Sequence, residues 1–139
     1  MTNSIFLPFF LTMLLTIVVW FYMYAKRIPF IQRAGLKPEQ ITSQGLAAVS
    51  PPDVANPSDN LKNLFEVPVI FYAIVLYLHV TNQVDGAHVI AAWVFAIFRI
   101  LHSAVHCTIN IIPLRFGLYA ISTLAVWVMV VRAAFALLD

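Results

Sequence analysis

The chain has 139 residues, of which 62% are hydrophobic and only 10% are charged, and its mean hydropathy is +0.89. A soluble domain carries far more charge, so this composition indicates a chain whose solvent is lipid. The net charge of +2 and the lack of any basic run argue against a nucleic-acid-binding protein, and the single cysteine, Cys107, excludes an oxidoreductase that needs a cysteine pair.

Four apolar runs predict four membrane-spanning helices, which together form one domain over residues 1–139. The runs cover residues 5–25, 61–80, 89–107 and 114–138. About 20 apolar residues in helical form cross the hydrocarbon core, and an open sheet would leave backbone groups unsatisfied there. We therefore expect an all-α fold, a four-helix transmembrane bundle. The first run is a retained span rather than a signal peptide, because Lys26 and Arg27 follow it instead of preceding it.

The first two runs are separated by a polar connector, residues 26–60, which is rich in proline and contains two glycines. This composition predicts a loop, with a short helix around residues 38–45. The other two connectors, residues 81–87 and 108–112, are short, so neighbouring helices should run antiparallel.

Basic residues predict the orientation of the chain in the membrane. The connector over residues 81–87 has no Lys or Arg, whereas the first and third connectors are flanked by Lys26, Arg27, Arg33, Lys37, Lys62 and Arg115. The positive-inside rule places the first and third connectors in the cytoplasm and both termini outside. The exception is Arg132, near the outer end of the last run, where its head group can snorkel.

Polar side chains recur at helical spacing within the last three runs. They are Asp59, just before the second run, with Asn63 and Glu66 in it, then Arg99, His102 and His106 in the third, and Arg115, Tyr119 and Ser122 in the fourth. Intervals of three or four residues place each set on one face of its helix, toward the cytoplasmic end. Because a charge at mid-bilayer costs at least about 2.5–3.5 kcal/mol, we expect these faces to form one functional polar pocket.

A structural explanation covers part of this pattern. Glu66 and Arg99 would then be a buried ion pair that fixes the register of two helices. That pairing accounts for two charges and leaves Asn63, His102 and Arg115 without a role.

A metal site is a second alternative. His102 and His106 lie one helical turn apart, as a metal-binding pair does, with Cys107 and Glu66 nearby. Two histidines at this spacing often arise by chance, so we expect no metal.

The polar motifs, in their order and spacing, resemble the MAPEG superfamily, the membrane-associated proteins in eicosanoid and glutathione metabolism. Residues 63–66 are similar to the family's Asn-x-x-Glu signature, and residues 56–63 resemble its bacterial branch. Arg99-x-x-His102 matches a motif of the prostaglandin E synthase-like members, and residues 113–119 match the opening of their fourth span. The resemblance covers nearly the whole chain.

The resemblance implies a homotrimer in the bacterial inner membrane that binds glutathione between neighbouring subunits near the cytoplasmic face. Arg115 would be the catalytic residue, because its guanidinium would stabilise the glutathione thiolate. The glutathione-binding residues implied are Asn63, Glu66, Arg99, His102, His106 and Tyr119.

Three positions depart from the family pattern. Asp59 stands where members carry an arginine, His106 where a tyrosine is frequent, and Phe116 where synthase-like members have serine. The leading hypothesis is a glutathione-dependent transferase or peroxidase that acts on a lipophilic electrophile. The alternatives are a non-catalytic trimer that binds a lipid or a partner protein, and a small transporter, which the apolar outer halves of the spans disfavour.

Overall fold

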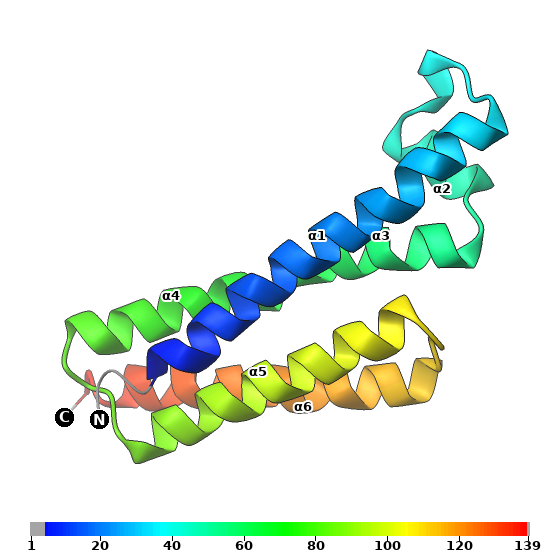
Figure 1. Ribbon diagram of the computed structural model, residues 1–139. Coiled ribbons are helices and arrows are strands. Elements are labelled where there is room, and N and C mark those ends of the chain that lie inside the picture. The colour runs from blue at the N-terminus through cyan, green and yellow to red at the C-terminus, as the bar shows by residue number, and fades with distance from the viewer. Residues whose placement is uncertain (1–4, 139) are drawn as a thin grey trace.

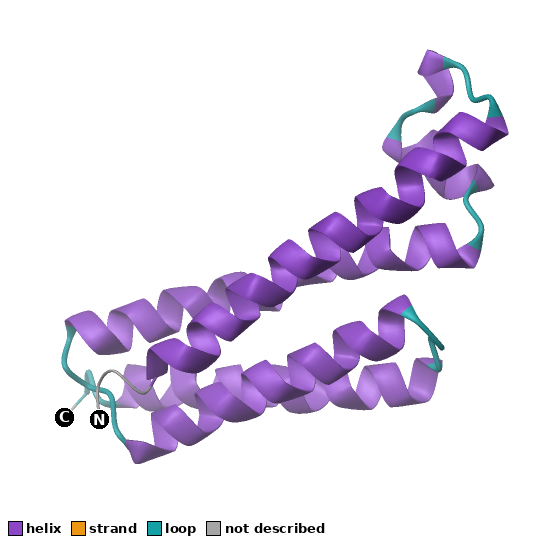
Figure 2. Ribbon diagram, viewed as in Figure 1, coloured by secondary structure: helices purple, strands orange, loops and turns teal. Residues whose placement is uncertain are grey.

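The computed structural model describes residues 5–138, and helices are the only regular secondary structure among them (Figure 2). The elements are α1 (Phe6–Ala34), the 3-10 helix η2 (Pro38–Gln40), α2 (Ser43–Val49), α3 (Pro52–Leu64), α4 (Val67–Val80), α5 (Gly86–Cys107) and α6 (Ile112–Phe135). The expected all-helical fold class is confirmed. Residues 1–4 and 139 of the predicted domain lie outside the described residues.

Four helical segments are long and apolar enough to cross a membrane, as predicted. They are α1, the consecutive pair α3–α4, α5 and α6. Both ends of the described chain and the α4–α5 connection lie at one end of the bundle, and the other two connections lie at the opposite end (Figure 1). The two connectors that carry the basic residues are therefore on the same side of the bundle.

Most of residues 26–60, predicted as a loop, are helical. α1 continues to Ala34 and ends at Gly35, whose left-handed φ of 59° suits a helix terminus. α3 begins at Pro52. Proline suits the first turn of a helix, because the N–H that it lacks would have no hydrogen-bond partner within the helix. Ion pairing of Lys26 with Asp53, at 3.8 Å, joins α1 to α3. Together these segments form an arm that extends beyond the α5–α6 connection (Figure 1).

The second span is broken between α3 and α4. Glu66 has φ −98° and ψ −103°, which is outside the helical region. The break has a local cause, because Pro68 has no N–H to donate to the carbonyl of Leu64 and its ring would clash with that carbonyl. Asp59, Asn63 and Glu66 therefore do not share one continuous helical face, contrary to the prediction.

The apolar core lies where α4, α5 and α6 meet the first turns of α1. The rings of Phe71 on α4 and Phe95 on α5 are stacked with their centroids 4.2 Å apart, and both residues are fully buried. Ala92 and Ala96 of α5 are also buried, and such small side chains allow neighbouring helices to approach closely. The packing of this core fixes the position of the α5 face that carries the predicted site residues.

Candidate functional site

Arg99 of α5 lies completely buried, with 0% of its surface exposed. Its guanidinium carbon is 5.5 Å from the centre of the Phe95 ring and 5.0 Å from that of Tyr119. Within residues 5–138, none of its three side-chain nitrogens has a hydrogen-bond partner. Two aromatic faces stabilise a cation only in part, so this buried guanidinium has no anionic partner within the described chain.

Glu66 does not supply that anion. Four ion pairs occur among the residues that the structure describes, and none of them joins Glu66 to Arg99. The alternative of a buried Glu66–Arg99 pair is therefore wrong. The break before α4 turns Glu66 toward the surface, where it is exposed.

Glu66 and Arg99 nevertheless lie at similar depth. The Ser103 hydroxyl donates a hydrogen bond to Asn60 Oδ1 at 3.2 Å, which fixes a common level on α3 and α5. From that level toward the α4–α5 connection, Arg99 is four residues away and Glu66 is six, or about 6 and 9 Å along the helices. The two side chains therefore lie at similar levels, although only Glu66 is exposed.

His102 extends the group of unsatisfied polar atoms around Arg99. Its Nδ1 lies 3.0 Å from the backbone oxygen of Arg115. A carbonyl oxygen only accepts, so Nδ1 carries the proton, and the buried Nε2 has no partner in the described part of the chain. The His106 ring lies 5.6 Å from that of His102, and the Tyr119 ring lies 5.8 Å away.

Arg115 opens α6 and is half-buried. Its Nη1 donates to Asn110 Oδ1 at 2.6 Å, and Asn110 Nδ2 donates to Asn56 Oδ1 at 3.2 Å. This relay connects the first turn of α6 to the α5–α6 connection and to α3. Asn56 and Asn110 did not emerge as site residues from the sequence, because the contact depends on how the connection folds.

The structure brings together five of the seven predicted site residues: Arg99, His102, His106, Arg115 and Tyr119. Asn63 is half-buried on α3 and, among the described residues, its side chain has no hydrogen bond, while Glu66 is exposed. Within a single chain, the site residues of α5 and α6 therefore lie together, whereas Asn63 and Glu66 of the second span lie outside that group.

Asn60 is a buried residue that the predicted site omitted. It is 0% exposed, and besides accepting from Ser103 it donates to Cys107 Sγ at 3.5 Å. Its neighbour Asp59 is exposed and pairs with Lys62 at 2.9 Å. The sequence signal was its spacing, since Asn60 lies one helical turn before the buried Leu64.

Residues 5–138 contain no group of three or more His, Cys, Asp or Glu side chains placed to hold a metal ion. The pair His102 and His106 therefore has no third ligand of these types within the described chain.

Comparison with known proteins gives a family match. The model of the MAPEG family matches residues 5–135, nearly the whole chain. No curated protein and no solved structure matches the chain.

Proposed function

Because the chain belongs to the MAPEG family, as its motifs predict, we propose that it is an integral membrane enzyme that uses glutathione. It acts as a transferase or peroxidase on a lipophilic electrophile that enters from the bilayer. When bound, glutathione supplies the nucleophile: its sulfur bonds to carbon as a leaving group departs, or it takes an oxygen from a hydroperoxide as the O–O bond breaks and an alcohol leaves. In the second case another glutathione then displaces water from the sulfenic acid to give the disulfide. The chain binds, orients and ionises this thiol.

The observation that carries the proposal is the unpartnered cation at Arg99. A buried guanidinium without an anion is costly, which favours a site that is completed by an anionic ligand. Glutathione has two carboxylates, and a carboxylate can accept two parallel hydrogen bonds from an arginine. Since Arg99 has no exposed surface, the carboxylate reaches it only when a covering side chain such as Tyr119 changes its rotamer.

Arg115 is proposed as the catalytic residue. It is half-buried, so a ligand at the protein surface can reach its guanidinium. A free thiol with a pKa near 8.5 is only a few per cent ionised at neutral pH. Each unit by which a nearby cation lowers that pKa corresponds to about 1.4 kcal/mol of thiolate stabilisation.

The second-span residues support binding between subunits of a homotrimer. Glu66 is an exposed carboxylate at the depth of Arg99 and forms no ion pair within the described chain. An unpaired charge facing lipid is costly, so we assign Glu66 and Asn63 to a site completed by a neighbouring subunit. There Glu66 would bind the ammonium of glutathione, while His102, His106 and Tyr119 line the opposite side.

The proposed orientation follows the basic residues. The end of the bundle that carries the first and third connectors faces the cytoplasm of a bacterial cell. The termini lie on the other side of the inner membrane. Glutathione then enters from the cytoplasm, where the polar residues of α5 and α6 are closest to water.

A non-catalytic trimer that binds a lipid or a partner protein is the second candidate. Asp59 favours it, because the position of the family arginine here carries a carboxylate that pairs with Lys62 of its own helix. Phe116 favours it too, since this large apolar side chain is 67% exposed at the start of α6.

Titration with glutathione tests the proposal. The purified full-length protein in detergent should bind glutathione saturably, with heat release and a rise in thiolate absorbance. Arg115→Ala should lose the thiolate signal, whereas Arg33→Ala, an exposed arginine at the end of α1, should keep it. Absence of binding at millimolar glutathione in a folded oligomer would reject the enzyme and favour the second candidate.

A further inference from the structure

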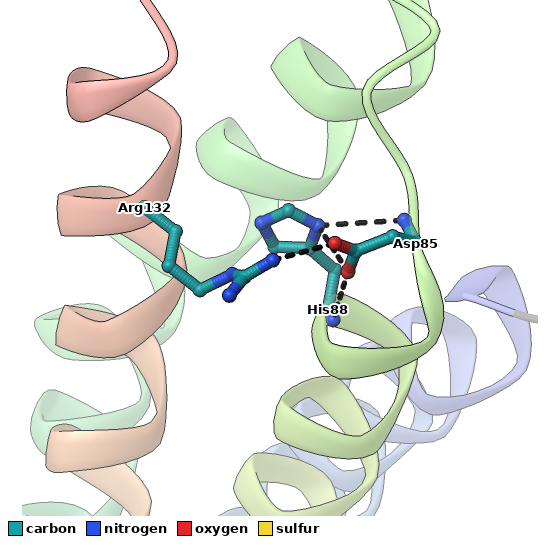
Figure 3. Close-up of polar contacts among 3 residues, drawn as sticks. All are labelled: Asp85, His88 and Arg132. Carbon is teal, nitrogen blue, oxygen red and sulfur yellow. Dashed lines mark hydrogen bonds and ion pairs between the residues drawn. The ribbon is translucent and has the colours of Figure 1, made fainter.

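A second polar cluster lies at the opposite end of the bundle from Arg115. Asp85 precedes α5, His88 lies in the first turn of α5, and Arg132 lies in the last turn of α6 (Figure 3). The Asp85 carboxylate accepts hydrogen bonds from Arg132 Nη2 at 2.5 Å and from the backbone N–H of His88 at 2.9 Å. This carboxylate is therefore already satisfied, and it joins the beginning of α5 to the end of α6.

His88 presents an unused hydrogen-bond donor. It is only 5% exposed, and its Nδ1 accepts from the backbone N–H of Asp85 at 3.4 Å, which completes the capping box of α5. The proton of the neutral ring then lies on Nε2. A protonated ring, which forms an ion pair with Asp85 Oδ1 at 2.8 Å, carries a proton on Nε2 as well. In both states Nε2 is a donor, and it has no partner among residues 5–138.

Gln83 adds an unused acceptor. Its Oε1 is buried and has no donor in the part of the chain that the structure describes. Gln83 and His88 both line one open cavity of about 440 Å³, which is within the size range of small-molecule sites. Buried polar atoms without partners are rare, which favours a ligand group that accepts from His88 and donates to Gln83. A hydroxyl does both, whereas an ammonium only donates.

Arg132 supplies donors for an anion in the lining of the same cavity. Its side chain is 47% exposed, and its contact with Asp85 is made through Nη2. A guanidinium has five N–H donors, so others remain for the oxygens of a phosphate. Phe135 and Ala136 add an apolar part to the lining. The cavity therefore combines a hydroxyl-binding pair, a cation and an apolar surface.

The cavity lies at the level of lipid headgroups. α5 has 22 residues, which span about 33 Å, close to the ~30 Å thickness of the hydrocarbon core. Its first turn, with His88, therefore lies at one boundary of that core. The leaflet concerned is the one opposite the basic connectors.

We propose that this cavity binds the headgroup of a phospholipid that ends in a hydroxylated glycerol, as phosphatidylglycerol does. A headgroup hydroxyl accepts from His88 Nε2 and donates to Gln83 Oε1, while the phosphate binds to Arg132. Both unpartnered atoms are buried, so the hydroxyl reaches them when the side chain of Gln83, which lies between two helices, changes its rotamer. The ammonium of phosphatidylethanolamine cannot accept from His88, and a choline group neither accepts nor donates there. The proposal does not depend on the glutathione site.

Thermal unfolding of delipidated full-length protein in detergent tests this assignment. Phosphatidylglycerol should raise the unfolding midpoint by about 4 °C more than phosphatidylethanol of the same acyl chains does. Phosphatidylethanol has the same negative charge but no headgroup hydroxyl, so equal effects of the two lipids would overturn the proposal. Glycerophosphoglycerol, the soluble headgroup, should have no effect at the same concentration; an effect equal to that of the lipid would overturn the assignment to a lipid.

Variants locate the effect in this cavity. His88→Leu should lose the difference between the two lipids, and because that difference is measured within each variant, a change in basal stability does not obscure it. Gln83→Met, in the connection before α5, should reduce the difference and serves if His88→Leu does not fold. His79→Leu is the matched control, because His79 packs against Phe6 and does not line the cavity. An undiminished difference in Gln83→Met, or in a folded His88→Leu protein, would contradict the proposal.

Discussion

The guanidinium of Arg115 is held by the side-chain oxygen of Asn110, with 2.6 Å between Nη1 and Oδ1. Asn110 adopts a left-handed φ of 47°, which asparagine tolerates better than most residues, and it is itself tied to Asn56 of α3. A neutral acceptor orients the cation without cancelling its charge. The proposed catalytic group is therefore positioned by two amides while its charge stays available to an anion.

The first prediction follows from that neutrality. Asn110→Asp should keep the hydrogen bond and the backbone conformation but pair Arg115 with a carboxylate. We expect the pKa of bound glutathione to rise by about one unit, which lowers the ratio of thiolate to thiol about tenfold at any given pH. The measurement is a pH titration of thiolate absorbance at saturating glutathione.

Asn82→Asp is the matched control for this experiment. Asn82 also has a positive φ, 55°, but it lies in the connection at the opposite end of the bundle. Its substitution should leave the titration unchanged. An unaltered titration in Asn110→Asp would show that Asn110 does not position the catalytic charge.

Replacing Arg99 should have opposite effects on the stability of the protein and on glutathione binding. Arg99→Met replaces a buried, unpartnered charge by an apolar side chain of similar length. We expect the free energy of unfolding without ligand to increase, by about 1–4 kcal/mol, and glutathione binding to disappear. Thermal unfolding and calorimetry measure the two effects; a destabilised variant that still binds would refute the assignment.

Asn60 should contribute more to the stability of the protein than Asn63, the asparagine of the Asn-x-x-Glu motif. Asn60→Ala leaves the Ser103 hydroxyl without its acceptor in a buried site, which costs about 1–3 kcal/mol. Asn63→Ala, at a half-buried position, should cost less than about 1 kcal/mol and instead weaken glutathione binding. Equilibrium unfolding in denaturant distinguishes the two, and equal losses would disprove the different roles.

Asp85, at the α4–α5 connection, makes the stability of the protein depend on pH. The backbone N–H of His88, with the charges of His88 and Arg132, holds the pKa of this carboxyl below its ordinary 3.8. A depressed folded-state pKa contributes stability above the unfolded value, and that contribution is lost as pH falls through the folded value. Asp85→Asn should therefore lower the unfolding midpoint slightly at pH 7, and the difference from wild type should shrink as the pH falls below the ordinary value of 3.8. A constant difference down to pH 2.5 would contradict this linkage.

Several features were predictable because they depend only on composition and spacing. The four apolar runs predict the four span-capable helices, and the intervals from Arg99 to His102 and His106 place these side chains on one face of α5. The same intervals and motifs indicated the family whose model matches the chain. The helical arm was not predicted, because the prolines were interpreted as loop residues although Pro52 begins a helix.

The pairing of residues from different helices was decided by the tertiary structure. Spacing alone made Glu66 a partner for Arg99, but the break caused by Pro68 turns the carboxylate outward and leaves the guanidinium without an anion. The same holds for Arg132, which pairs with Asp85 only because α6 ends beside the start of α5. Sequence thus determined which side chains lie at each membrane level, since rise per residue fixes depth; packing and helix breaks determined which of them meet.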